Sequence, residues 1–347
     1  MSSRSVAEGT AALGQIRSVL VINVSRIGDT LLATPALRAI AHAFPDAELT
    51  CLAHPRRAEV LEHLPFLARV GRIDKRMAPL LGRLPGQRYD LAFVYGFDRA
   101  LVNYALRVAR RVVAFRPGRA VLDARLAPAV AEPAALSRHA VFMRLALLEP
   151  LGIAPAGLRL AYQVTDAERA WARETLRSTC PGAAPRIGLQ VASFPTKGYR
   201  DWPVESFAEL AHRIRARWPG AHFLIFGGAE ERARTAWLAG QLGEAASRFA
   251  GTLSLRQTAA LMSLTQLYVG VDTGPTHMMG CFDVPLVAMY HCHSPSRLLG
   301  PLEHPCFYPI DHPHGHPCPE ETPMSAIGVD AVFAAVERAL TEHPPAA

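Results

Sequence analysis

Short apolar runs alternate with helical patterns along the chain, and this rhythm predicts strands joined by helices. The first run, Ser18–Val24, is followed by apolar residues at the spacing of a buried helix face: Leu37, Ile40, Ala41 and Phe44. We expect Pro35 in the first turn of that helix, with Thr34 as its cap. If the helix begins at Asp29 instead, Pro35 must kink it. Three more strands are predicted: Ala47–Ala53, Leu91–Tyr95 and Arg111–Phe115.

A segment rich in proline and glycine, residues 150–185, precedes a second half with the same rhythm. Its predicted strands are Ile187–Val191, Phe223–Phe226, Leu267–Val271 and Pro285–Tyr290. Its predicted helices are Asp166–Ser178, Glu205–Trp218, Glu230–Leu242 and Ala331–Leu340, and a capping box at Ser254–Gln257 opens another. Strands that alternate with helices pair in parallel. The chain is therefore predicted to be α/β, with two doubly wound parallel sheets.

The segment between the halves sets the predicted domains. We expect a loose tail at residues 1–16, an N-terminal domain at 17–160 and a C-terminal domain at 161–347, whose last helix can pack back on the first domain. Ligands of doubly wound sheets bind beyond the carboxyl ends of the strands. Two facing domains would place a cleft between them, and such a cleft is a natural site for two substrates.

The composition is that of a folded protein with a basic surface. Half of the 347 residues are apolar and 19% are charged, which suffices for two hydrophobic cores. No apolar run reaches the roughly 20 residues that span a bilayer and no signal peptide is evident, so we expect a cytosolic protein. The net charge of +7 allows an anionic partner, although an arginine-rich surface explains it equally well. The basic residues form no block with interleaved aromatics, which argues against nucleic acid.

Cysteine and histidine gather in one C-terminal segment. The six cysteines include no CxxC pair, so we expect reduced thiols and no disulfide scaffold. Residues 291–318 hold several groups that can bind a metal: His291, Cys292, His293, His304, Cys306, His312, His314, His316 and Cys318. Their spacing matches no standard zinc site and prolines interrupt it, so a polar loop is the preferred interpretation and no metal site is assigned.

The first strand runs into Ser25-Arg26-Ile27-Gly28-Asp29. Gly28 allows a sharp turn, which would point the carboxylate of Asp29 into the predicted cleft. A carboxylate in that place could take the proton from an incoming hydroxyl group. The alternative is that Asp29 only caps the helix and complements its dipole.

The strand Leu267–Val271 runs into Asp272-Thr273-Gly274-Pro275-Thr276-His277. A helix that begins there would offer free N–H groups to a phosphate without a metal. Thr273 and Gly274 would donate, and Asp272 would accept hydrogen bonds from sugar hydroxyls. The alternative is a capped helix with a buried His277.

Two further loops carry candidate binding groups. Ser193, Lys197 and Arg200 lie on one loop that could hold a diphosphate, although a solvated loop is equally consistent. The acids of Gly227-Gly228-Ala229-Glu230-Glu231 could bind ribose hydroxyls, although this signal alone is weak. The chain has no GxGxxG, GxxxxGK[ST] or HExxH motif, which argues against a dehydrogenase, a P-loop protein or a zincin.

Together these segments resemble glycosyltransferase family nine, the ADP-heptose:lipopolysaccharide heptosyltransferases. The resemblance spans about residues 18–340, and four segments carry it: VLVINVSRIGDTLLATPALRAI, RDWPVESFAELA, FGGAEE and AGTLSLRQTAALMSLTQLYVGVDTGPTHMMG. It implies a GT-B fold, in which two Rossmann-like domains face each other across a cleft. It also implies that the N-terminal domain binds the acceptor and the C-terminal domain binds the nucleotide sugar.

The resemblance further implies an inverting, metal-independent transfer that needs no cofactor. Asp29 falls on the proposed catalytic base of the family. The implied donor site comprises Ser193, Lys197, Arg200, Glu230, Glu231, Asp272, Thr273, Gly274 and His277. We expect the acceptor site to comprise Ser25, Arg26 and Gly28 beside Asp29, together with Arg56 and Arg57, which belong to the basic residues of the N-terminal half that could steer an anionic acceptor.

The partners implied by the resemblance are ADP-heptose and an acidic lipopolysaccharide core on the anionic inner membrane surface, which the positive charge suits. Two features depart from the family. Arg200 stands where a lysine is usual, and Tyr290-His291-Cys292-His293-Ser294 replaces a Gly-Pro-Thr loop near the donor. Two rival interpretations stay open: a GT-B enzyme with a different nucleotide sugar and surface-glycan acceptor, and a non-catalytic protein that binds nucleotide sugars.

Overall fold

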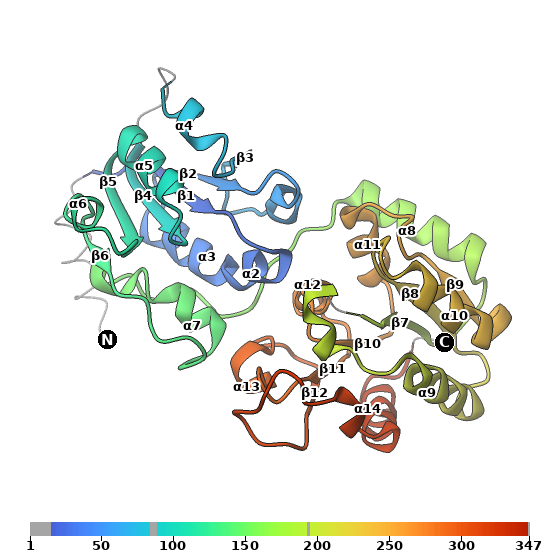
Figure 1. Ribbon diagram of the computed structural model, residues 1–347. Helices are drawn as coiled ribbons and strands as arrows, with labels where there is room; N and C mark the ends of the chain where they lie inside the picture. The colour runs from blue at the N-terminus through green and yellow to red at the C-terminus, as the bar shows by residue number, and fades with distance from the viewer. Residues whose placement is uncertain (1–14, 84–88, 193–194, 346–347) are drawn as a thin grey trace. The chain divides into compact units, whose positions relative to one another are not determined.

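The chain divides into two compact units, Met1–Gln163 and Val164–Ala347, and each is built on one six-stranded sheet. The computed structural model describes residues 15–83, 89–192 and 195–345. Figure 1 shows the helices and strands of each unit.

The first sheet has the strand order β3-β2-β1-β4-β5-β6, and every neighbouring pair is parallel. Its strands are β1 (Ser18–Asn23), β2 (Glu48–Ala53), β3 (Arg69–Arg72), β4 (Tyr89–Tyr95), β5 (Ala109–Phe115) and β6 (Ala129–Val130). Its helices are α2 (Ile27–Leu32), α3 (Thr34–Ala43), α4 (Ala78–Leu81), α5 (Arg99–Val108), α6 (Ala120–Asp123) and α7 (Ala140–Leu145), with short turns η1 (Ala58–Leu61) and η2 (Glu149–Leu151). This strand order is that of a Rossmann domain.

The second sheet has the order β12-β11-β10-β7-β8-β9, which is the same arrangement when its strands are counted along the chain. Its strands are β7 (Arg186–Gln190), β8 (His222–Phe226), β9 (Ala246–Arg248), β10 (Leu267–Val271), β11 (Leu286–Tyr290) and β12 (Phe307–Asp311). Its helices are α8 (Asp166–Thr179), α9 (Val204–Arg217), α10 (Arg232–Leu242), α11 (Leu255–Met262), α12 (Gly274–Met279), α13 (Ser296–Leu299) and α14 (Val329–Glu342). The short turns are η3 (Pro195–Arg200), η4 (Gly243–Ala245) and η5 (Met324–Ala326).

Helices cover both faces of each sheet, which explains why the strands do not alternate apolar and polar residues. All five residues of β8, β10 and β11 are buried. Residues of α9, α10 and α14 share one apolar core with the inner strands of the second sheet. Trp202 is anchored in this core, and its indole N–H donates to the carbonyl of Ile327 at 2.8 Å. The loop that carries Arg200 is therefore tied firmly to the sheet.

The predicted α/β class with two doubly wound sheets is confirmed, and the predicted inner strands lie within two residues of the observed ones. Two local expectations in the first unit are wrong. Gly28 lies inside α2 and makes no sharp turn, because the helix already begins at Ile27. Thr34 does not cap α3; its hydroxyl donates to the carbonyl of Leu31 at 2.6 Å.

The expectation of reduced thiols throughout is also wrong, because Cys292 and Cys318 form a disulfide. The two residues are 26 positions apart, and the chain between them carries α13 and β12 and returns to the end of β11. No local pattern in the sequence indicates that return. The other four cysteines, Cys51, Cys180, Cys281 and Cys306, take no part in a disulfide.

Among the helices of the described chain, none combines the length and the apolar character that a membrane crossing needs.

Candidate active site

An ion pair between Asp272 and Arg200 lies at the carboxyl end of the second sheet. Asp272 directly follows β10 and is 1% exposed, and its Oδ2 lies 2.5 Å from Nη1 of Arg200. Nε2 of His277 lies 3.3 Å from Oδ1, but within the described residues no hydrogen bond reaches that atom. Burial alone would raise the pKa of Asp272; the contact with His277 and the charge of Arg200 outweigh it and lower the pKa. Asp272 is thus held as a buried carboxylate.

Tyr199 gathers the two cations of the same loop. Its hydroxyl accepts from Nζ of Lys197 at 3.2 Å and from Nε of Arg200 at 3.3 Å, and donates to Oε1 of Glu320 at 3.2 Å. Glu320 also accepts from Lys197 at 3.3 Å. Tyr199 and Glu320 were not predicted as site residues, because Glu320 lies 123 positions from Lys197 and reaches it only through the fold.

Thr273 and Gly274 begin the short helix α12 beside this cluster. Gly274 is its first residue and Thr273 is the N-cap, but the threonine side chain makes no capping hydrogen bond. His277 is buried, as the alternative interpretation of this motif held. The hydroxyl of Thr276 donates to the carbonyl of Val271 at 2.5 Å and so ties the turn back to β10.

The two acids after β8 lie apart from the Arg200–Asp272 pair. Strand β7 separates β8 from β10, so their ends are about 10 Å apart. Glu231 is the N-cap residue of α10, and its Oε2 accepts from the backbone N–H of Gly228 at 2.6 Å, whereas Glu230 is exposed. The predicted Ser193 lies outside the described residues.

Asp29 lies in the first turn of α2, beyond the carboxyl end of β1. Its Oδ1 accepts from Nη2 of Arg144, on α7, at 3.0 Å, and its side chain is 43% exposed. Of the alternative for Asp29, the capping part is wrong, because the N-cap is Arg26 and that helix end has no side-chain cap; as an acid in the first turn, Asp29 does complement the helix dipole. The carboxylate is oriented by Arg144 and remains accessible.

The other predicted residues of the first unit meet near Asp29. Nη1 of Arg57 donates to the carbonyl of Ser25 at 3.0 Å, and the Ser25 hydroxyl donates to Oδ1 of Asn23 at 2.8 Å. Burial and the charges of Arg26 and Arg56 lower the pKa of Arg57, against the opposing charge of Asp29.

A pocket of about 590 Å³ opens in the first unit and takes in two of the predicted residues. Its lining includes four cationic side chains: Arg56, Arg57, Lys75 and Arg76. Its two acids accept hydrogen bonds from backbone N–H groups. Asp74 accepts from the amides of Arg76 and Met77, and Asp98 caps α5 by accepting from the amide of Ala100. Because its four cations outnumber its two acids, the pocket is positive in character and suits an anion. Lys75 and Arg76 were not predicted as site residues, because they follow strand β3, which the sequence pattern does not indicate.

Comparison with known proteins places this arrangement in a family. The family model described as glycosyltransferase family 9 (heptosyltransferase) matches residues 85–306, a span that contains Arg200 and Asp272. The lipopolysaccharide heptosyltransferase 2 of Salmonella typhimurium is 27% identical over 317 residues, which are 82% of this chain and 86% of the relative.

Solved structures agree at the level of the fold. The ADP-heptose lps heptosyltransferase II of E. coli has a TM-score of 0.78 at 20% identity and covers 94% of this chain and 99% of its own. The E. coli heptosyltransferase WaaC with ADP-2-deoxy-2-fluoro heptose has a TM-score of 0.67 at 18% identity and covers 92% and 99%. The predicted GT-B class of fold is thereby confirmed. The chain belongs to glycosyltransferase family 9, the heptosyltransferase family.

Proposed function

We propose that the chain transfers a heptose from ADP-heptose to a hydroxyl group of the lipopolysaccharide inner core, with inversion at the anomeric carbon. The names of the Salmonella relative and of the ADP-sugar complex of WaaC support this choice of donor and acceptor. The observation that carries the proposal is the buried Arg200–Asp272 pair with Lys197 beside it, because it presents two cations where a nucleotide diphosphate would leave.

The C-terminal unit would bind the donor. As the bond between sugar and diphosphate breaks, the sugar gains oxocarbenium character and negative charge grows on the diphosphate. Arg200 and Lys197 can meet that charge, and the N–H groups at Gly274 can add to it. Glu231 and Glu230, about 10 Å along the sheet edge, would bind the ribose. Since the cations supply the positive charge, we expect transfer to continue in EDTA.

The N-terminal unit would bind the acceptor. The cationic pocket around Arg56 and Arg57 suits phosphate groups of an inner core. Asp29 would take the proton from the attacking hydroxyl group, in a single displacement that inverts the sugar. Ser25, Arg26 and Gly28 would shape the acceptor side of that site. Such an enzyme acts in the cytoplasm, at the anionic surface of the inner membrane.

A panel of nucleotides tests the donor. ADP should raise the thermal stability of the full chain by the equivalent of about 1 kcal/mol or more, while UDP, GDP and CMP at the same concentration should not. An Arg200→Met variant should lose the shift, whereas Arg213→Met, which alters a half-buried arginine of α9, should keep it. Selective stabilisation by another nucleotide would assign a different donor. Stabilisation by ADP without any sugar transfer would favour the non-catalytic alternative.

A further inference from the structure

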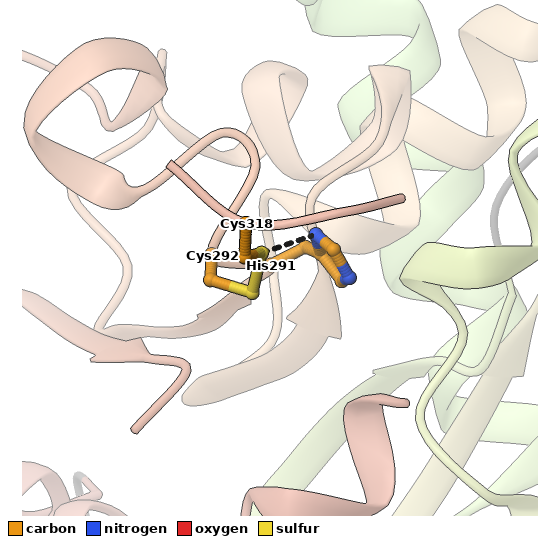
Figure 2. Close-up of side chains that lie close together, drawn as sticks. All are labelled: His291, Cys292 and Cys318. Carbon is orange, nitrogen blue, oxygen red and sulfur yellow. Dashed lines mark hydrogen bonds between the residues drawn. A yellow bond between two sulfur atoms is a disulfide. The ribbon is translucent and has the colours of Figure 1, made fainter. Parts of the chain in front are cut away.

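A cluster of three metal-capable side chains lies behind the donor loop. His291 and Cys292 follow β11 directly, and Cys318 comes from the segment after β12. All three are buried, and His291 is fully inaccessible. Figure 2 shows the imidazole of His291 facing the two sulfur atoms. None of the three belongs to the proposed catalytic groups.

The imidazole nitrogen of His291 and the sulfur of Cys318 are nearly as close as two ligands of one cation, whereas the two sulfur atoms must separate from the disulfide. One nitrogen or sulfur atom from each residue lies within 4.8 Å of the others, and Nδ1 of His291 is 4.0 Å from Sγ of Cys318. A tetrahedral Zn²⁺ with usual bond lengths would hold a nitrogen and a sulfur ligand about 3.6 Å apart. The Cα atoms of the cysteines are 5.7 Å apart, so small side-chain movements of the reduced thiols would suffice.

The hydrogen bonds of His291 orient it as a ligand. Its Nε2 lies 2.8 Å from the carbonyl oxygen of Thr322, which can only accept, so Nε2 carries the proton. Nδ1 is then the unprotonated nitrogen, and it faces Cys318. Metal-bound histidines typically donate their second nitrogen to such a backbone carbonyl. Nδ1 accepts from the amide of His293 at 3.0 Å, and a cation would replace that hydrogen bond.

We propose that His291, Cys292 and Cys318 form a binding site for one borderline-soft divalent cation of the Zn²⁺ class when the disulfide is reduced. Two thiolates and an imidazole favour such ions over Mg²⁺ or Ca²⁺. The disulfide is the metal-free form. A dithiol supplies two electrons and two protons and becomes a disulfide. A phosphine supplies two electrons and becomes the phosphine oxide, while one water molecule supplies the two protons and the oxygen. Either reductant gives two thiols. The cation then displaces both thiol protons and keeps its charge, with a water molecule as fourth ligand.

The site has a consequence for the donor loop, which rests on the proposed function. Glu320 lies two residues after Cys318 and contacts both Lys197 and Tyr199. The ring of Tyr199 also packs edge-on against His291, with centroids 5.0 Å apart. Either the disulfide or the bound metal ion therefore ties the segment of Glu320 to the end of β11. It thereby steadies the basic side chains of Lys197 and Arg200, which would face the diphosphate.

Metal content tests the proposal without any measurement of transfer. The full chain, purified without a histidine tag, is divided into a sample reduced with a phosphine under argon and an oxidised sample. Each is loaded with Zn²⁺ or Co²⁺ and desalted. We expect about one ion per reduced chain, none per oxidised chain, and the intense near-ultraviolet absorption of a Co²⁺–thiolate bond only after reduction.

Variants identify the ligands. Cys292→Ser, Cys318→Ser and His291→Ala should each weaken metal binding by roughly 10–100-fold or more, because loss of a group that only hydrogen-bonds to a metal ligand already costs that much. Cys281→Ser, which alters a cysteine of the same unit outside the disulfide, should bind the metal as the wild type does. If the reduced wild type retains no more metal than the oxidised protein, or than a Cys292→Ser/Cys318→Ser variant, the site does not exist. The reduced and oxidised samples of the wild type have the same sequence. Their comparison therefore tests the site even if a variant fails to fold.

Discussion

At the scale of single residues, the pairing of Asp272 with Arg200 changes the role expected for the aspartate. A carboxylate that is 1% exposed is unfavourable unless a cation compensates it, and Arg200 does so at 2.5 Å. In this structure the carboxylate is directed at Arg200 and His277 and not at solvent. We therefore infer that Asp272 acts through Arg200, as a positioning residue, more than as a direct partner of sugar hydroxyls.

Asp272→Asn should destabilise the C-terminal unit by about 3 kcal/mol, because it leaves a largely buried guanidinium without its counter-charge. The same variant should lose the stabilisation by ADP. Urea unfolding and nucleotide titration measure the two effects. Asp330→Asn is the control, since the Asp330 carboxylate that pairs with Arg213 is exposed, and it should cost less than about 1 kcal/mol. Unchanged ADP affinity in Asp272→Asn would show that Asp272 does not position Arg200.

Asp29→Asn keeps the shape of the side chain and removes the proposed base. We expect kcat to fall by about 10²–10⁴, with little change in KM for the donor, because the amide cannot take the proton. Asp46→Asn, an exposed position of the same unit, should react at the wild-type rate. Steady-state kinetics measure both, and near-wild-type turnover of Asp29→Asn would remove Asp29 as the base.

At the scale of elements, the sequence predicts best where apolar periodicity is strong. The inner strands such as β10 (Leu267–Val271) are continuous apolar runs and were predicted nearly residue by residue. The capping box Ser254–Gln257 also forms as predicted. The edge strands β3, β6, β9 and β12 were missed because they are short, polar or interrupted by proline, and sheet pairing alone makes them strands.

A second capping box links two helices of the C-terminal unit. Thr165 and Glu168 cap α8, and the same Glu168 accepts from Nη2 of Arg256, on α11, at 2.7 Å. The hydrogen bond from Arg256 outweighs the effect of burial and lowers the pKa of Glu168 from 4.5 to about 2. A depressed carboxyl pKa stabilises the fold above the unfolded value of 4.5, and this stabilisation is lost as the pH falls toward 2.

Glu168→Gln should therefore lower the free energy of unfolding by roughly 3 kcal/mol at pH 7, and the difference from the wild type should shrink between pH 5 and pH 2. Urea unfolding at several pH values measures it. Glu174→Gln, on the same helix with an exposed partner, should change stability by less than about 0.5 kcal/mol at every pH. A difference for Glu168→Gln that does not depend on pH would contradict the assigned pKa.

At the scale of the whole molecule, the two units repeat one strand order and divide the proposed work. The sequence motifs identified residues at the carboxyl ends of the inner strands, such as Asp29 and Asp272, because a doubly wound sheet gathers its ligands there. They did not identify Lys75, which follows an unpredicted edge strand, or Glu320, which reaches Lys197 from a distant loop. Such contacts depend on tertiary structure and leave no local pattern.

The division of work predicts separate effects on the two substrates. Lys75→Ala with Arg76→Ala should raise KM for a phosphorylated acceptor by about tenfold, roughly 1.4 kcal/mol, and leave KM for the donor unchanged. The double variant Arg69→Ala with Arg72→Ala removes two exposed cations of β3. It should leave KM for the acceptor and KM for the donor unchanged. Equal effects of the two double variants would mean that the pocket has no specific part in acceptor binding.

Transfer itself tests the central claim most directly. Purified protein is mixed with ADP-heptose and a lipopolysaccharide core that lacks heptose, and the product is analysed by mass spectrometry and by NMR of the new anomeric centre. We predict the gain of one heptose for each ADP released, with inverted configuration at that centre. Release of ADP without a heptosylated product, transfer only from another nucleotide sugar, or a retained configuration would contradict the account.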